Sequence, residues 1–174
     1  MYKFYQIVVT LYSWMLFVSL WIFSTLTAAI LTLDTKDKEN IFNNIERVFS
    51  RIAFKLLGMK IEIQGLENIP KNEPVIFTSN HQSMMDIKLS LACIPINFSF
   101  ISKDTIFRVP ILGAYMTASG HIPIQRTEDR KAYETLLTAV KKLTAKKSLV
   151  VFPEGTRSED GQEKRQVIFL LSAT

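Results

Sequence analysis

A long run without charge near the N-terminus constrains this chain more than any other feature. From Phe4 to Leu33 the sequence contains no Asp, Glu, Lys or Arg. Because about 20 apolar residues suffice to cross the hydrocarbon core of a bilayer, this run predicts a membrane segment. The apolar region of a secretory signal peptide is shorter, which favours an uncleaved segment. The sequence leaves open whether the segment crosses as one helix or folds back as a helical hairpin.

The charges on either side of this run predict its orientation. Only Lys3 precedes the run, whereas several basic residues follow it: Lys36, Lys38, Arg47, Arg51, Lys55 and Lys60. Since positive residues gather on the cytoplasmic side of membrane proteins, we expect the remainder of the chain to lie on the cytoplasmic face.

The sequence predicts a division into a membrane segment (1–35), an amphipathic connecting helix (36–60) and an α/β domain (61–174). Apolar residues of the connecting helix recur at helical spacing: Ile41, Ile45, Val48, Phe49, Ile52 and Leu56. Basic residues lie four positions apart on another face: Arg47, Arg51 and Lys55. Two interpretations of this basic face remain open, a solvated face of a core helix and a helix lying at the lipid headgroup layer.

Strand-like and helical segments alternate along the rest of the chain. Strands are expected at residues 60–65, 74–80, 97–102, 121–126 and 148–155, and helices at about 83–92 and at 128–147. This alternation predicts an α/β fold, with a mostly parallel sheet flanked by helices. In such sheets the loops that leave the carboxyl ends of the strands gather at one edge, where ligands bind.

Polar residues follow three of these expected strands. His81 and Asp86 come after the second, and a carboxylate that fixes the tautomer of a histidine makes its ring a stronger general base. A serine triad is not favoured, because Ser83 lies next to His81 in sequence and no G-x-S-x-G elbow occurs. The pair also lacks the cluster of further ligands that a metal site needs, so no metal is expected.

The other two loops carry positive charge. "FPEGTRS" at 152–158 combines a glycine turn with Arg157, and backbone amides beside a guanidinium suit a phosphate. Lys103 and Arg126 also lie near strand ends, and together with Arg157 they predict a basic pocket beside His81.

Composition narrows the classes of function. Apolar residues make up 48% of the 174 residues and charged residues 21%, so a packed core is expected. The net charge of +5 fits an anionic membrane surface or a phosphorylated substrate. A nucleic-acid module is not favoured, because no recognition motif is visible and the charge lies beside the membrane segment. With Cys93 as the single cysteine, no disulfide within the chain is possible.

Two motifs carry a resemblance to a known family. "NHQSMMD" (80–86) has the NHxSxxD form of the H-x4-D motif of glycerolipid acyltransferases, and "FPEGTRS" matches their second signature. Between them, Gly120, Ile124 and Arg126 fill the expected places of the family's middle block. The chain therefore resembles the 1-acyl-glycerol-3-phosphate acyltransferases, also called lysophosphatidic acid acyltransferases, over roughly residues 55–160.

This resemblance implies transfer of an acyl chain from acyl-CoA or acyl carrier protein to the sn-2 hydroxyl of lysophosphatidic acid, giving phosphatidic acid. It implies that His81 removes the hydroxyl proton, that Asp86 orients His81, and that no acyl-enzyme forms. The implied substrate-binding residues are Lys103, Arg126, Glu154, Gly155, Thr156 and Arg157. No cofactor is expected beyond the acyl donor. The expected partners are membrane lipids, the lysophospholipid acceptor and the acyl donor, and not nucleic acid.

The alternatives are an acyltransferase for another lysophospholipid or for glycerol 3-phosphate, and an inactive truncated homologue. Members of the family continue after the second signature through a helix and a further strand, whereas this sequence stops at Thr174. We therefore expect an α/β domain that is incomplete at its C-terminus, with an exposed sheet edge.

Overall fold

The structure is a computed structural model of the chain, and it describes residues 2–81, 83–125, 129–152 and 168–172. Its elements are helix α1 (Tyr2–Leu31), helix α2 (Lys38–Leu56), the 3-10 turn η1 (Leu66–Asn68), strand β1 (Val75–Ser79), helix α3 (Met85–Cys93), strand β2 (Phe98–Lys103), helices α4 (Asp104–Phe107) and α5 (Leu112–Ala118), strand β3 (Ile122–Ile124), helix α6 (Asp129–Thr144), and strands β4 (Ser148–Val151) and β5 (Ile168–Ser172).

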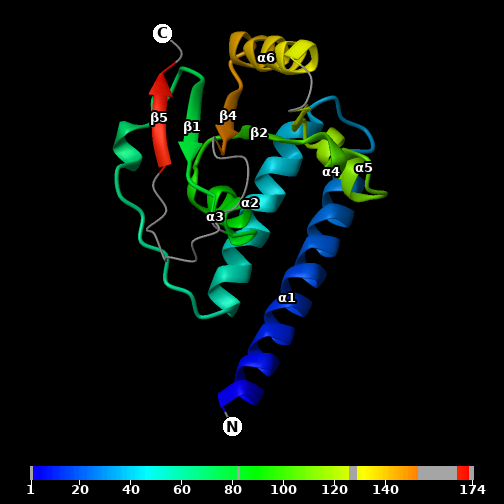
Figure 1. Cartoon of the computed structure of the whole chain (residues 1–174), viewed down its shortest axis with the longest axis vertical. Coiled ribbons are helices and arrows are strands. Elements are labelled where there is room, and N and C mark those ends of the chain that lie inside the picture. The colour runs from blue at the N-terminus through cyan, green and yellow to red at the C-terminus, as the bar shows by residue number, and fades with distance from the viewer. Residues whose placement is uncertain (1, 82, 126–128, 153–167, 173–174) are drawn as a thin grey trace.

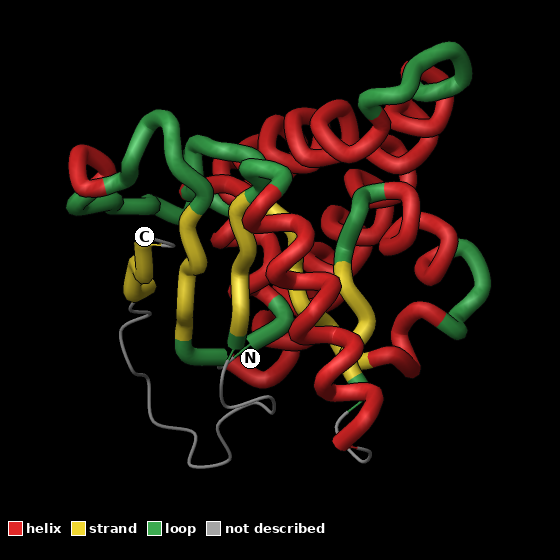
Figure 2. Tube along the Cα trace, turned by 90° about the horizontal axis from the view of Figure 1, so that it is seen from above, coloured by secondary structure: helices red, strands yellow, loops and turns green. Residues whose placement is uncertain are grey.

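The strands form one sheet in the order β3-β2-β4-β1-β5. β1, β2, β3 and β4 run parallel, and β5 pairs antiparallel with β1. Figure 2 shows the strands side by side, with β5 and the C-terminus at one edge. The predicted fold class, a mostly parallel sheet flanked by helices, is confirmed. The expected exposed edge is not placed by the sequence; in the structure β5 pairs with β1 and forms the edge strand on that side.

Both faces of the sheet are covered, which explains the continuous apolar run in β4. Adjacent strand residues point to opposite faces. Val150 packs with Leu91 of α3 in one apolar cluster, and its neighbour Leu149 packs with Ala139 of α6 in another. A strand covered on both sides needs apolar residues at every position rather than at alternate ones.

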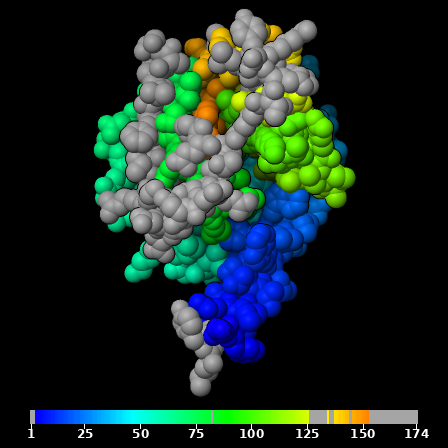
Figure 3. Space-filling model, in the orientation of Figure 1, coloured from blue at the N-terminus to red at the C-terminus, as the bar shows by residue number. Residues whose placement is uncertain are grey.

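The apolar run forms a single continuous helix, α1, and not a helical hairpin. α1 packs against α2, and its N-terminal end projects away from the α/β body in Figures 1 and 3. Residues Lys3–Leu31 are long and apolar enough to cross a membrane, judged by length and composition alone. Most of this helix surface is not covered by the rest of the protein.

One prediction about the segments that follow was wrong. Residues 60–65 form no strand, although their sequence alternates, because no described strand pairs with them and their side chains stay largely exposed.

The predicted connecting helix is present as α2, and its apolar face is divided. Ile41, Ile45 and Phe49 are partly buried, whereas Val48, Ile52 and Leu56 are exposed. The fully buried residues of α2 are Phe42, Asn43, Glu46, Ser50, Ala53 and Phe54.

A buried carboxylate, that of Glu46, lies where α2 packs against its neighbouring helices. Glu46 is 2% exposed, accepts a hydrogen bond from Ser24 of α1 at 2.5 Å, and pairs with Lys88 of α3 at 2.6 Å. Through Glu46, the polar face of α2 therefore packs against α1 and α3. Burial raises the pKa of the Tyr115 hydroxyl well above its ordinary value, and the nearby Glu46 carboxylate raises it further.

The basic face of α2 is engaged within the protein in part, with Arg47 half-buried and Arg51 and Lys55 exposed, and its position at a lipid headgroup layer stays a prediction. Arg47 donates to the backbone oxygens of Ile94 (3.1 Å) and Ile96 (2.8 Å), just beyond the end of α3. Arg51 donates to the backbone oxygen of Ala92 at 2.8 Å. The last carbonyl groups of a helix lack partners within it, so the two arginines bond to the C-terminal end of α3 and the segment after it.

Candidate active site

The first candidate residues lie in the loop between β1 and α3, which we call the β1–α3 loop (residues 80–84). β1 ends at Ser79, and α3 begins at Met85 with Asp86 in its first turn. A carboxylate is favoured at this position, because the N-terminus of a helix carries partial positive charge. The first turn of α3 therefore places an acidic side chain beside the β1–α3 loop, at the carboxyl edge of the sheet.

His81 and Asp86 are in direct contact. His81 Nδ1 lies 2.9 Å from Asp86 Oδ2, and the backbone N–H of Ser83 donates to the same oxygen at 2.7 Å. The two side chains are 16% and 11% exposed. The backbone N–H of Ser83 thus holds the Asp86 carboxylate independently of the histidine. The carboxylate in turn orients the His81 ring.

Ser83 shapes this loop. Its hydroxyl oxygen accepts a hydrogen bond from the backbone N–H of Met85 at 3.2 Å, and its backbone oxygen accepts one from Asp86 N–H at 3.2 Å. A serine that bonds to backbone two residues ahead stabilises a turn at a helix start. Through these bonds Ser83 holds the turn that leads into α3.

Phe152 is a site residue to which the sequence analysis gave no role. Its ring stacks on the His81 imidazole with centroids 4.5 Å apart and planes 29° apart. It follows β4, the strand next to β1, so the sheet brings the two rings together. The available signal was its place as the first residue of "FPEGTRS", directly after a buried strand.

The contacts determine what the imidazole of His81 can do. An ionised carboxylate only accepts hydrogen bonds, so the ring nitrogen beside Asp86 carries the hydrogen. The other nitrogen, Nε2, then keeps its lone pair. A neutral imidazole in this tautomer accepts a proton at Nε2, and the carboxylate stabilises the charge that results.

The second histidine has a different environment. His121 is buried, and its Nδ1 accepts a hydrogen bond from the backbone N–H of Phe100 at 3.1 Å. Burial, with a contribution from the positive charge of Lys142, lowers the pKa of His121 to about 3. A ring that stays neutral and bonds to the backbone in the core is a structural histidine.

The predicted basic pocket is described only in part. Lys103 is exposed at the carboxyl end of β2, the same edge as the β1–α3 loop, with β4 lying between β2 and β1. The other predicted binding residues lie outside the described residues: Arg126, Glu154, Gly155, Thr156 and Arg157. Within the described part of the chain, no three His, Cys, Asp or Glu side chains are grouped as metal ligands.

Comparison with known proteins identifies the family of this chain. The sequence model of the family described as Acyltransferase matches residues 60–167, which include the β1–α3 loop. The chain belongs to the acyltransferase family. A chloroplastic 1-acyl-sn-glycerol-3-phosphate acyltransferase of Arabidopsis thaliana is 42% identical over 130 residues, which are 70% of this chain and 36% of that protein. A Chlamydomonas reinhardtii protein of the same description is 34% identical over 155 residues, 86% of this chain and 45% of that protein.

The fold agrees with a solved member of the acyltransferase family. The crystal structure of the 1-acyl-sn-glycerophosphate acyltransferase of Thermotoga maritima superposes with a TM-score of 0.75 at 29% sequence identity. The superposition covers 93% of this chain and 66% of that one. The chain thus spans less than half the length of the two algal and plant relatives and about two thirds of the bacterial one.

Proposed function

We propose that this protein is a 1-acyl-sn-glycerol-3-phosphate acyltransferase, which moves an acyl chain from a thioester donor to the sn-2 hydroxyl of lysophosphatidic acid. The observation that carries the proposal is the His81–Asp86 pair, with its carboxylate bonded to Ser83 N–H and its ring stacked on Phe152. The family and the printed activity of the relatives support the choice of reaction.

In the proposed reaction His81 is the general base. Its Nε2 takes the proton of the acceptor hydroxyl as the oxygen attacks the thioester carbonyl carbon, giving a tetrahedral intermediate. The intermediate collapses with cleavage of the C–S bond, and the imidazolium returns the proton to the departing thiolate. The products are the ester and a free thiol, and no residue of the protein is acylated. Asp86 stabilises the imidazolium between the two proton transfers.

We assign substrate binding to the positive residues at the same edge of the sheet. Lys103 projects from the end of β2, and in the proposal it contacts the phosphate of lysophosphatidic acid together with Arg126 and Arg157. An arginine fork matches two oxygens of a phosphate, whereas a lysine acts as a point charge. Glu154, Gly155 and Thr156 are assigned to the same phosphate pocket, on the sequence motif that they share with Arg157. Acyl-CoA and acyl carrier protein are both retained as donors, and no cofactor is required.

The proposed enzyme works at a membrane, because its substrates carry acyl chains. Large apolar side chains are exposed along α1, among them Trp14, Met15 and Phe23. The exposed residues Val48, Ile52 and Leu56 extend this apolar surface onto α2. An apolar surface of this extent on two packed helices fits lipid better than water. The basic residues that follow the apolar run favour placing the α/β domain on the cytoplasmic face.

A direct assay tests the proposal. Membranes that contain the full chain are given lysophosphatidate and a radiolabelled acyl-CoA, and in a parallel reaction an acyl carrier protein donor. We expect labelled phosphatidate in at least one of the two reactions, and none with His81→Ala as the matched inactive control. A folded protein that acylates no acceptor would contradict the proposal. Acylation of another lysophospholipid, or of glycerol 3-phosphate, in preference to lysophosphatidate would identify a different acceptor.

A further inference from the structure

The segment between α4 and α5 exposes a run of apolar side chains. We call residues 108–111, which are Arg108, Val109, Pro110 and Ile111, the α4–α5 loop. Val109 is 47% exposed, Ile111 is 72% exposed, and Pro110 between them is exposed as well. Single exposed apolar residues are ordinary, but three in succession are unfavourable in water unless another molecule contacts them.

The backbone of Ile111 adds a second cost. Its φ of 65° and ψ of −55°, with Leu112 N–H donating to the backbone oxygen of Pro110 at 2.7 Å, form a γ-turn of the strained kind. A β-branched residue is disfavoured at positive φ, where glycine is the usual choice. The turn is held because Gly113 lies against the backbone of Phe107, where a side chain would collide with the carbonyl oxygen. Strained residues of this kind cluster at ligand-contacting sites.

The α4–α5 loop lies beside the apolar part of α1. Phe107 and Leu112, which flank the loop, pack in one cluster with Trp21 and Ala28 of α1. Figures 1 and 3 show α4 and α5 next to the C-terminal half of that helix. Trp21 and Ala28 both belong to the uncharged run that ends at Leu33. The loop is therefore level with a part of α1 that the proposed function places in lipid.

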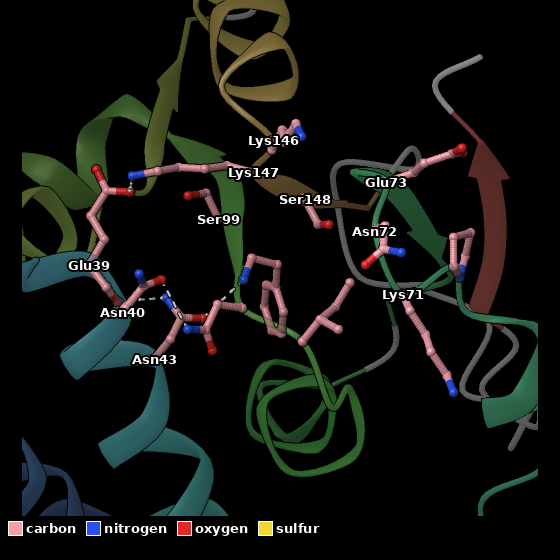
Figure 4. Close-up of a pocket in the computed structure, with 14 residues that line it drawn as sticks. Glu39, Asn40, Asn43, Lys71, Asn72, Glu73, Ser99, Lys146, Lys147 and Ser148 are labelled. Atoms are coloured by element: carbon pink, nitrogen blue, oxygen red, sulfur yellow. Dashed lines mark hydrogen bonds and ion pairs between the residues drawn. The ribbon is translucent and has the colours of Figure 1, made fainter.

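The opposite edge of the sheet is polar. A cavity of about 320 Å³ lies there, at the amino ends of β2 and β4, and its lining includes Glu39, Lys71, Glu73, Lys146 and Lys147 (Figure 4). Lys147 pairs with Glu39 at 2.5 Å, and the other three charged side chains are exposed. Charged groups lose hydration when they leave water, so this edge faces water. The α4–α5 loop instead follows the carboxyl end of β2, on the side of the β1–α3 loop.

We propose that the α4–α5 loop enters the lipid surface beside α1, with Val109 and Ile111 among the acyl chains and Arg108 at the headgroups. The proposal rests on the proposed function, which places α1 at a membrane. Lipid covers the exposed apolar run and continues the apolar surface of α1. The Arg108 side chain is 69% exposed and pairs with Asp104 at 2.6 Å. Its charge is thus balanced from the protein side, and its other N–H groups are directed to lipid phosphate.

This contact would hold the carboxyl edge of the sheet at the membrane. Asp104, the first residue of α4, directly follows Lys103, and its carboxylate accepts a hydrogen bond from Gln125 Nε2 at 2.9 Å. α4 is therefore joined to the ends of both β2 and β3. A loop anchored in lipid would keep this edge, which carries Lys103, close to a phosphate group at the membrane surface.

Site-directed fluorescence in vesicles tests the proposal. The background is the full chain with Cys93→Ala, since Cys93 is the single cysteine. Val109→Cys or Ile111→Cys is labelled with a polarity-sensitive fluorophore and reconstituted in vesicles of phosphatidylcholine and phosphatidylglycerol, with or without nitroxide groups on the acyl chains. We expect a blue shift of the emission and about a twofold or greater quenching by nitroxide, because interfacial apolar groups lie roughly 5–10 Å into the boundary between headgroups and acyl chains.

Two further positions make the result specific. Val140→Cys on α6 is the matched control, because Val140 is 46% exposed and Val109 is 47% exposed. In Figure 1 α6 lies at the end of the molecule opposite to the N-terminus of α1, so we expect no quenching there. Phe23→Cys reports on α1 itself, where the side chain is 63% exposed, and we expect quenching. All of these changes are at exposed positions, and thermal unfolding of each labelled variant checks the fold.

Three outcomes would overturn the proposal. Quenching at position 23 but not at 109 or 111 would remove the loop from the membrane and leave the proposed function intact. Equal quenching at positions 109, 111 and 140 would indicate contact with lipid that is not specific to the loop. A blue shift without nitroxide quenching, growing with protein concentration, would identify a second copy of the chain as the partner. Because no acyl transfer is measured, failure here is distinguishable from failure of the proposed enzyme.

Discussion

The two histidines of this protein belong to one row of contacting aromatic rings, but they have different hydrogen-bond partners. The His121 ring packs against Phe100 with centroids 5.3 Å apart, Phe100 stacks on Phe152 at 6.1 Å, and Phe152 stacks on His81 at 4.5 Å. His121 bonds to a backbone N–H in the core, whereas His81 faces a carboxylate at the sheet edge. The hydrogen-bond partner, and not the residue type or the neighbouring rings, distinguishes the histidine that we propose for proton transfer from the structural one.

The strongest test of this comparison is His81→Ala. We expect a loss of about 10²- to 10⁴-fold in kcat/KM for acyl transfer, since this is the usual contribution of a general base. The ring is partly exposed at a loop, so we expect the free energy of unfolding to change little. Steady-state kinetics and thermal unfolding measure the two effects. Activity within threefold of the wild type would remove His81 from the mechanism.

Asp86→Asn is expected to have the next largest effect. The amide keeps the size of the side chain and can still accept from Ser83 N–H, but it loses the charge that stabilises an imidazolium. We expect kcat to fall by about 100-fold with little change in KM, because the loss arises during proton transfer. A rise in KM at constant kcat would indicate that Asp86 acts in substrate binding instead.

His121→Asn should change the pH dependence of stability and not the chemistry. With a pKa of about 3 when folded and about 6.5 when unfolded, His121 takes up a proton only on unfolding between these values. The free energy of unfolding of the wild type therefore decreases as pH falls from 6.5, by about 1.4 kcal/mol per pH unit.

Asparagine offers an oxygen near the position of Nδ1 and does not titrate. Denaturant unfolding at pH 6.5 and pH 5.0 should show a shallower dependence in His121→Asn than in the wild type. Glu39 does not confound this range. Burial acts to raise its pKa, but ion pairs with Lys147 and Lys142 outweigh burial and leave the pKa below its ordinary value. An unchanged slope in the variant would contradict the assignment to His121.

The smallest effect is expected from Phe152→Leu. Leucine keeps the apolar volume roughly but loses the flat face that stacks on the His81 ring. We expect a fall of about threefold to tenfold in kcat, because a loosely held base is less often in a productive orientation. Phe152→Tyr keeps the ring face and should retain activity. Equal activity of the leucine and tyrosine variants would show that stacking contributes nothing to orientation.

Local pattern was sufficient to predict most of the sheet. Apolar runs predicted β1 and β4, whose residues are buried or partly buried throughout. Apolar residues at helical spacing predicted the helix that follows β3. Residues 60–65 show the limit of this reasoning. Alternation indicates a strand only where a neighbour supplies the hydrogen bonds, and sequence pattern does not say which segment is the neighbour.

The burial of Glu46 in α2 shows the same limit. Glu46 reads as a solvent-facing residue, and only its partners Ser24 and Lys88, 22 and 42 residues away, allow it to be buried. Arg47 likewise contacts carbonyl groups 47 and 49 residues along the chain. For the candidate site, the pair His81 and Asp86 was predictable from its spacing, whereas the stacking of Phe152 depends on which strand lies beside β1.

The strand order has a consequence for how the protein is made. β1 is flanked in the sheet by β4, whose residues pair with it across 73 positions, and by β5, whose residues pair with it across 89 to 97 positions. At synthesis rates of about 5–20 residues per second, β1 leaves the ribosome several seconds before either neighbour exists. During that interval an apolar strand has both edges unpaired, which makes it prone to association with other chains. The segment that leads into His81 therefore stays open to association with other chains for several seconds while the chain is being translated.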